Sequence, residues 1–309
     1  MSKKLNTNKG KFLSKKDPPH KRRKLGWLKI TLLTVCAVIL LTVLGVGGFL
    51  LHNELAESKF QKMAEQTRIA ATAPVTPPAT GEDPLADPAE VTEPERPTIP
   101  TNDIGLRTAA VDENRPILPQ YQELYAQNKD LFGWITIPGT KVDYPVMYTP
   151  GESEKYLHTG FDGSSSYPGV PFIDINCQPE SQNLLIYGHN MPNGSMFRDL
   201  LKYQQRTQWQ KQPTITFNTL YEEQEYEIVA AFYDRIYRTT ETDVFKFYYF
   251  IDPETEEEFN YGIEQIKSKA LYDTGVEVNY GDDLITLITC TYQTTNGRFV
   301  VVARKITDK

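Results

Sequence analysis

The chain has 309 residues, of which 39% are hydrophobic and 24% charged, so a chain that is disordered throughout is excluded and one or two domains fit its length. The net charge of -7 averages two unlike parts. Residues 1–29 carry 11 Lys and Arg and one Asp, whereas residues 30–309 carry 22 Lys and Arg and 39 Asp and Glu. We therefore treat residues 1–29 as a separate basic tail.

An uncharged apolar run over residues 30–51 follows the basic tail directly. At about 1.5 Å per residue in a helix, this run can span a hydrocarbon core of about 30 Å. Basic residues stay on the cytoplasmic side, so we expect the N-terminus inside and everything after His52 outside. A nucleic-acid-binding tail and a cleaved signal peptide are the alternatives. The run exceeds the roughly 7–15 apolar residues of a signal peptide, which favours an uncleaved single-pass anchor.

A polar stalk and an extended linker are expected over residues 52–118. Proline has a fixed φ and no amide hydrogen, so a proline-rich segment forms neither a helix nor a sheet ladder. The linker's prolines are Pro74, Pro77, Pro78, Pro84, Pro88, Pro94, Pro97 and Pro100. Such a spacer would hold the following domain away from the membrane.

Short apolar runs between turn signals predict a mostly β domain over residues 119–309. The runs cover residues 134–137, 142–147, 183–187, 214–217, 226–233, 284–289 and 299–306. So many short strands predict a closed barrel or a sandwich. A short helix is expected over residues 120–129. A helix of about four turns is expected after Asp252 and Pro253, which would act as its N-cap and first residue.

Three cysteines are present, and Cys36 lies in the apolar run, where a thiol is a small apolar group. Cys177 and Cys290 would lie outside the cell, where a disulfide between them is one alternative. A domain of this size does not need one. Cys290 ends a buried strand, which suits either a packed core residue or a thiol held firmly beside a substrate groove.

Two other reactive residues also lie at strand ends. His189 follows the apolar run 184–188, and Arg298 opens an apolar strand eight residues after Cys290. A thiol that attacks an amide needs a histidine to exchange protons and a cation to stabilise the oxyanion. The three residues are therefore candidates for one catalytic site at the rim of the barrel.

The remaining candidates have simpler interpretations. His158 lacks a strand-end position, and Cys177 lies in a polar stretch, so neither is expected to be catalytic. No set of metal ligands stands out, and no metal or cofactor is expected.

Several separated motifs resemble those of class B sortases. Residues 286–290, Thr-Leu-Ile-Thr-Cys, resemble the TLxTC signature, and Arg298 follows on the next strand. Residues 187–197 and the opening segment 133–146 are similar to class B segments. A helical insertion before the cysteine strand also fits class B. One departure is Ile288, where class B members often have Ser.

That resemblance implies an eight-stranded sortase β-barrel with an N-terminal helical extension and a helix inserted before the cysteine strand, all preceded by a transmembrane helix. It implies a membrane-anchored cysteine transpeptidase outside a Gram-positive cell. Cys290 would attack the Thr carbonyl of a C-terminal sorting motif and form a thioester. His189 would act as acid and base, and Arg298 would position the substrate and stabilise the oxyanion.

The implied partners are surface proteins that carry a sorting signal, and the amine of a lipid II-type peptidoglycan precursor or of a pilin lysine. No nucleic acid is expected to bind. Two other functions stay open at this point. With water as acceptor, the same residues would make a membrane-bound cysteine protease. A barrel without activity would serve only as a binding surface, which the intact trio argues against.

Overall fold

The computed structural model describes residues 21–72, 115–152, 154–291 and 293–307. The chain divides into two compact units, Met1–His52 and Asn53–Lys309. Helix α1 (Lys21–Thr72) includes the apolar run that was expected to cross a membrane. Over the described ranges, however, no helix has the length and hydropathy of a membrane span, so the structure does not support that anchor. Much of the basic tail and most of the proline-rich linker lie outside the described residues.

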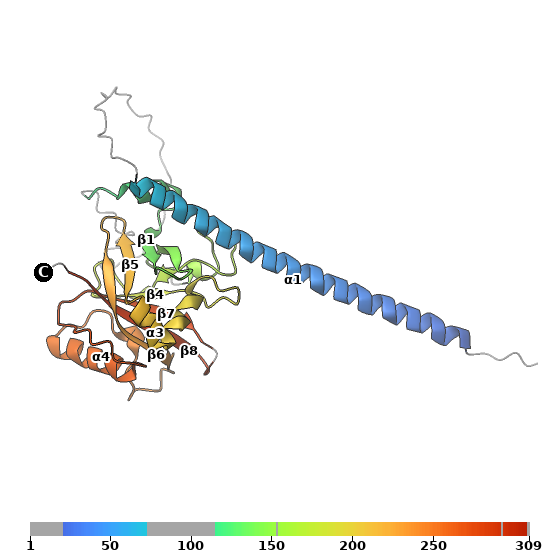
Figure 1. Ribbon diagram of the computed structural model, residues 1–309. Coiled ribbons are helices and arrows are strands. Elements are labelled where there is room, and N and C mark those ends of the chain that lie inside the picture. The colour runs from blue at the N-terminus through green and yellow to red at the C-terminus, as the bar shows by residue number, and fades with distance from the viewer. Residues whose placement is uncertain (1–20, 73–114, 153, 292, 308–309) are drawn as a thin grey trace, which may run out of the picture. The chain divides into compact units, whose positions relative to one another are not determined.

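Eight strands of the second unit form a closed barrel (Figure 1). The strands are β1 (Leu131–Thr136), β2 (Asp143–Met147), β3 (Phe172–Ile173), β4 (Asn183–Tyr187), β5 (Thr214–Thr219), β6 (Glu225–Arg235), β7 (Leu284–Cys290) and β8 (Gly297–Lys305). Their order around the barrel is β1-β2-β3-β4-β7-β8-β6-β5, and β5 pairs with β1 to close it. The mostly β, eight-stranded barrel is thereby confirmed.

The β4–β7 pair forms the wall from which the candidate site is built. The two strands run parallel, and their apolar residues are buried in continuous runs. A strand buried on both faces does not alternate between apolar and polar residues, which explains the unbroken apolar sequence of β7. β8 then pairs antiparallel with β7 on one side and with β6 on the other.

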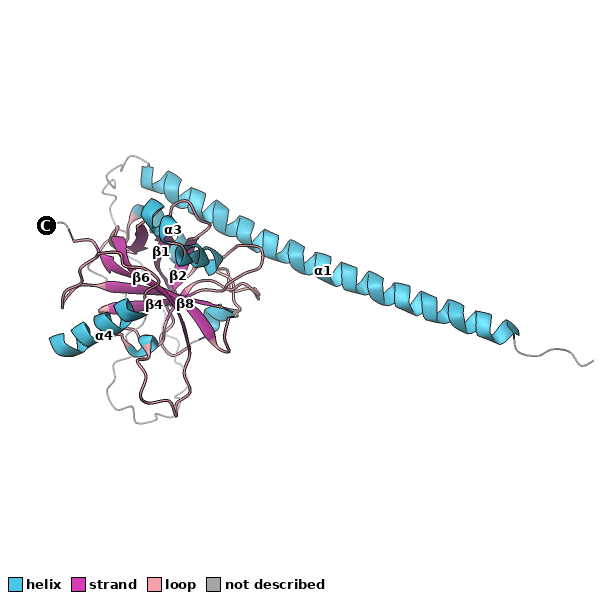
Figure 2. Cartoon of the chain, turned by 60° about the horizontal axis from the view of Figure 1, so that its bottom comes forward, coloured by secondary structure: helices cyan, strands magenta, loops and turns pink. Residues whose placement is uncertain are grey.

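Short helices lie outside the barrel, as Figure 2 shows for α3 and α4. The α-helices of the second unit that follow α1 are α2 (Pro119–Gln127), α3 (Arg206–Lys211) and α4 (Glu256–Lys269). The 3-10 helices are η1 (Lys155–Leu157), η2 (Phe197–Gln204) and η3 (Phe247–Tyr249). The predicted helices correspond to α2 and α4.

The start of α4 differs from the prediction. Thr255 is the N-cap, and its hydroxyl accepts a hydrogen bond from the Glu258 amide at 3.2 Å. Asp252 instead accepts hydrogen bonds from the Ser181 hydroxyl at 2.7 Å and the Gln182 amide at 2.8 Å. Its carboxylate therefore joins the insertion to the segment just before β4, which is why it does not cap the helix.

The part of α1 that belongs to the second unit contacts the barrel. Phe60 and Ala64 are buried, and the Phe60 ring meets Tyr144 of β2 edge-on, with ring centroids 5.4 Å apart. Lys59 forms an ion pair with Asp162 at 2.8 Å. The N-terminal extension of the domain is thus packed by both apolar and charged contacts.

Candidate active site

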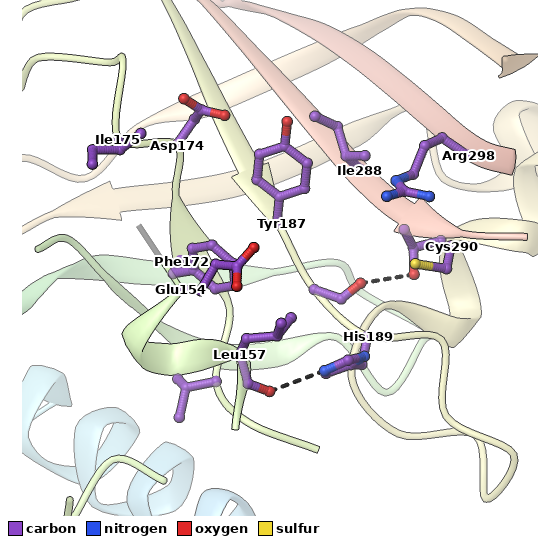
Figure 3. A pocket seen from close by; sticks show the side chains of 13 residues that line it. Glu154, Leu157, Phe172, Asp174, Ile175, Tyr187, His189, Ile288, Cys290 and Arg298 are labelled. Atoms are coloured by element: carbon purple, nitrogen blue, oxygen red, sulfur yellow. Dashed lines mark hydrogen bonds between the residues drawn. The ribbon is translucent and has the colours of Figure 1, made fainter. Parts of the chain in front are cut away.

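A cavity of about 300 Å³ is lined by His189, Cys290 and Arg298 together (Figure 3). They come from three places in the chain: the loop after β4, the end of β7 and the start of β8. One cavity thus brings together the three residues that the sequence singled out as candidates.

Strand register brings Cys290 and Arg298 together. They are directly opposed on β7 and β8, and opposed residues of an antiparallel pair point to the same face, with Cβ atoms about 4.5–5.5 Å apart. Ile288 lies two residues before Cys290 and so shares that face. Its partner on β4 is Tyr187. The floor of the cavity is therefore one face of β4, β7 and β8.

The residue before His189 keeps the histidine loop close to β7. The Gly188 amide donates to the Ile288 carbonyl at 3.1 Å, and the Thr289 hydroxyl donates to the Gly188 carbonyl at 2.8 Å. A Cβ at position 188 would lie 2.6 Å from the buried ring of Phe197. Because that contact is too short for a carbon atom, only glycine fits here.

The loop that follows His189 is held to the cysteine strand by Asn190. Its side-chain amide donates to the Cys290 carbonyl at 2.8 Å, and its oxygen accepts from the Arg198 guanidinium at 2.9 Å. The Phe197 amide donates to the His189 carbonyl at 2.9 Å and closes the loop. Asn190 was not predicted as a site residue, although it directly follows the histidine.

The backbone is strained at Met196, near the end of the same loop. Met196 is buried and has φ 55°, in the left-handed region that a residue with a side chain rarely occupies. Its amide donates to the Tyr144 hydroxyl at 3.0 Å, which helps to hold this conformation.

A hydrogen bond to the backbone sets the tautomer of His189. Its Nε2 lies 3.0 Å from the Leu157 carbonyl oxygen, and Figure 3 shows the ring between that carbonyl and Cys290. A carbonyl can only accept, so Nε2 carries the hydrogen. In the neutral ring Nδ1 is then the atom that can take up a proton.

The surroundings of His189 favour its neutral form. Burial lowers the pKa of His189 below its ordinary value, the nearby His158 acts in the same direction, and the Leu157 hydrogen bond opposes both. His158, which was not expected to be catalytic, is exposed but stacks on His189 with ring centroids 5.4 Å apart. Its Nδ1 lies 3.2 Å from the Tyr167 carbonyl oxygen.

Arg298 supplies positive charge to the cavity. One guanidinium nitrogen donates to the carbonyls of Asn296 at 3.2 Å and Gly297 at 3.0 Å. Burial raises the pKa of Tyr187 above its ordinary value, as does Asp174, whereas the charge of Arg298 opposes them. Tyr187 and Arg298 line the same cavity, so the guanidinium charge acts on its floor.

Cys177 differs from Cys290 in its burial, because Cys290 is partly exposed. Cys177 is completely buried, and burial raises the pKa of its thiol to about 12. All three cysteines are free, so the alternative of a Cys177–Cys290 disulfide is wrong. Across the described ranges of the chain, no group of three or more His, Cys, Asp and Glu side chains could hold a metal ion.

The arrangement of the cavity and barrel is matched by known proteins. A family model described as "Sortase domain" matches residues 135–306. Sortase B of Listeria monocytogenes is 32% identical over 205 residues, which cover 64% of this chain and 79% of that protein. The chain belongs to the sortase family, class B.

Solved structures of class B sortases agree with this assignment. The Staphylococcus aureus sortase B–substrate complex is 26% identical, with a TM-score of 0.54, and the match covers 62% of this chain and 87% of that one. A sortase B complexed with triglycine is 29% identical, with the same TM-score and the same coverage. This sortase is therefore an enzyme, a cysteine transpeptidase of the cell-wall sortase family.

The individual roles of His189, Cys290 and Arg298 stay predictions, now with defined geometry. Sequence patterns located all three because each stands at a strand end. The Leu157 carbonyl carries no such signal, since any residue supplies a carbonyl and only the fold brings this one to the His189 ring.

Proposed function

We propose that this sortase cleaves a C-terminal sorting motif after Thr and transfers the resulting carbonyl to an amine. The amine would belong to a peptidoglycan precursor or to a pilin subunit. The observation that carries the proposal is the single cavity that His189, Cys290 and Arg298 line in a chain of the sortase family.

In the first half-reaction the Cys290 thiol passes its proton to Nδ1 of His189, and its sulfur attacks the Thr carbonyl carbon. A C–S bond forms, and the carbonyl oxygen becomes an oxyanion beside the Arg298 guanidinium, which stabilises the developing charge. The C–N bond then breaks, and the departing amine takes a proton from His189. Because Nε2 is bonded to Leu157, Nδ1 is the atom we assign to this proton transfer.

In the second half-reaction an amine attacks the thioester. His189 accepts the proton of the amine, a new C–N bond forms and the C–S bond breaks. His189 then gives that proton to the departing sulfur, which regenerates the Cys290 thiol. The sortase B complexed with triglycine holds a peptide with a free amine, which supports an amine rather than water as the acceptor here.

The decisive experiment uses peptides that carry NPxTx or LPxTG motifs, with and without triglycine as amine donor. We expect the ligated product to replace the hydrolysed one as the triglycine concentration rises. Cys290→Ala should abolish both products and the acyl-enzyme seen by mass spectrometry, whereas Cys177→Ala should keep activity per folded molecule. Products that stay hydrolytic at saturating triglycine would instead identify a cysteine protease.

We further propose that the catalytic unit works outside the cell, anchored at the membrane. The basic tail and the uncharged run over residues 30–51 support this topology. Protease added to intact cells should digest the catalytic domain while cytoplasmic proteins survive. Protection of the domain until the cells are lysed would contradict the proposal.

A further inference from the structure

A carboxylate lies next to Arg298 on the side away from Cys290. In the β6–β8 register the residue opposite Arg298 is Asp234, just as Cys290 is opposite Arg298 in the β7–β8 register. Opposed residues of antiparallel strands share a face, so Asp234, Arg298 and Cys290 form one row across three strands. Opposite charges in such positions attract each other, and arginine pairs with carboxylates especially well.

Asp234 nevertheless pairs with a different cation. Its Oδ2 lies 2.6 Å from the Lys269 Nζ, while Oδ1 accepts hydrogen bonds from the Tyr237 hydroxyl at 2.6 Å and the Arg235 amide at 2.8 Å. In the part of the chain that the structure describes, no carboxylate forms an ion pair with Arg298. The Asp234 side chain is only 4% exposed, so water cannot replace these partners.

Lys269 comes from the helical insertion between β6 and β7. It is the last residue of α4, which lies beside β6 (Figure 2). Burial opposes its charge, but the Asp234 carboxylate outweighs that effect and raises the pKa of Lys269 above its ordinary value. The insertion therefore delivers a permanent cation to Asp234.

We propose that Lys269 is a positioning residue that holds the Asp234 carboxylate and so keeps it from pairing with the Arg298 guanidinium, which then serves the substrate oxyanion. This rests on the role assigned to Arg298 in the proposed function. A buried carboxylate that loses its cation is strongly destabilised. Arg298 is directly opposite Asp234 on β8, on the same face, so Asp234 would turn to it and compete with the substrate.

The first test is Lys269→Met, which keeps the length of the side chain and removes its charge. We expect kcat/KM for a sorting-motif peptide to fall about tenfold or more, since removal of one oxyanion donor typically costs about 100- to 1,000-fold. The change should lower kcat more than it raises KM, because the oxyanion is absent from the bound substrate and forms only as the thiol attacks. Alkylation of Cys290 by iodoacetamide, which needs no oxyanion partner, should change by less than about twofold.

Rescue separates positioning from a structural role. Asp234→Asn removes the competing charge, so it should keep kcat/KM near the wild-type value, and the double variant with Lys269→Met should recover it to within about threefold. Arg304→Met is the matched control, because it breaks an ion pair between β8 and β6 at the far end of the same strands. It should leave kcat/KM unchanged. A double variant as inactive as Lys269→Met alone would overturn the inference.

A crystal structure of the Lys269→Met protein tests the geometry without reference to activity. We expect an Asp234 carboxylate oxygen within about 4 Å of the Arg298 guanidinium. Asp234 that keeps its present position overturns the inference, even in an active enzyme. If the wild-type protein forms no transpeptidation product, the proposed function fails, and this structure still decides whether Lys269 keeps Asp234 from Arg298.

Discussion

The His189 ring illustrates how single contacts tune the site at the scale of the residue. Burial makes its charged form costly, while the Leu157 carbonyl holds Nε2 and fixes which nitrogen can exchange protons. A neutral ring with a free Nδ1 suits a group that must first accept the proton of the thiol and then donate it to the departing amine. The same burial makes the folded state sensitive to pH.

We predict that His189→Gln flattens the pH dependence of stability. The folded pKa of His189 lies below its ordinary value of about 6.5, so as pH falls through that value the unfolded chain binds the proton first. The free energy of unfolding therefore decreases below about pH 6.5, until the folded form is also protonated. Urea unfolding between about pH 7.5 and 5 should show a steeper loss for the wild type. Equal slopes would contradict this origin.

A site residue could be predicted from the sequence where it stands at the end of an apolar strand pattern. Cys290 and Arg298 flank a turn between two apolar strands, and antiparallel pairing then makes them neighbours. Lys269 and Asp234 could not be found this way. Their contact joins a helix end to a strand end that is far away in the sequence, and nothing local specifies it.

At the scale of elements, α1 is connected to the histidine loop through one tyrosine. The Tyr144 hydroxyl donates to the Glu57 carboxylate at 3.0 Å and accepts from the Met196 amide at 3.0 Å. Burial raises the pKa of Glu57 above its ordinary value. One hydroxyl thus joins a helix, strand β2 and the strained residue of the loop that carries His189.

We predict that Tyr144→Phe lowers the free energy of unfolding by about 1–3 kcal/mol, because the buried Met196 amide and the Glu57 carboxylate both lose a partner. Tyr233→Phe is the control, since the hydroxyl of Tyr233 donates to the side-chain oxygen of Gln204, an exposed residue, at 3.0 Å. It should change stability by less than about 0.5 kcal/mol. Chemical denaturation of both variants measures the difference. Equal losses in the free energy of unfolding would show that the Tyr144 contacts stabilise the fold no more than the exposed Tyr233 contact does.

Elements with a strong periodic pattern could be predicted, and those that depend on tertiary contacts could not. β7 is a long apolar run and was found within one residue of its end. β3 has only two residues, Phe172 and Ile173, and exists because β4 pairs with it. The N-cap of α4 was misplaced because Asp252 has the chemistry of a cap but bonds to Ser181 instead.

At the scale of the whole barrel, β8 has different charge arrangements at its two ends. At one end Arg298 lines the cavity beside Cys290. At the other end Arg304 pairs with Glu227 of β6 and with Asp282, which lies just before β7. Arg304 therefore links both neighbours of β8 on the side of the barrel away from the site. The ion pairs of Arg304 therefore stabilise the end of the barrel that lies away from the candidate active site.

We predict that Arg304→Met lowers the free energy of unfolding by about 1–2 kcal/mol while kcat/KM stays unchanged. The loss is smaller than for a fully buried pair because these side chains keep 21–29% of their exposure, so water screens them. Adding Glu227→Gln should restore part of the stability, since one unpaired carboxylate is removed. Urea unfolding gives the first quantity and peptide turnover well below the melting temperature the second. A folded Arg304→Met enzyme with lower turnover would mean that the far end of the barrel controls the site through β8.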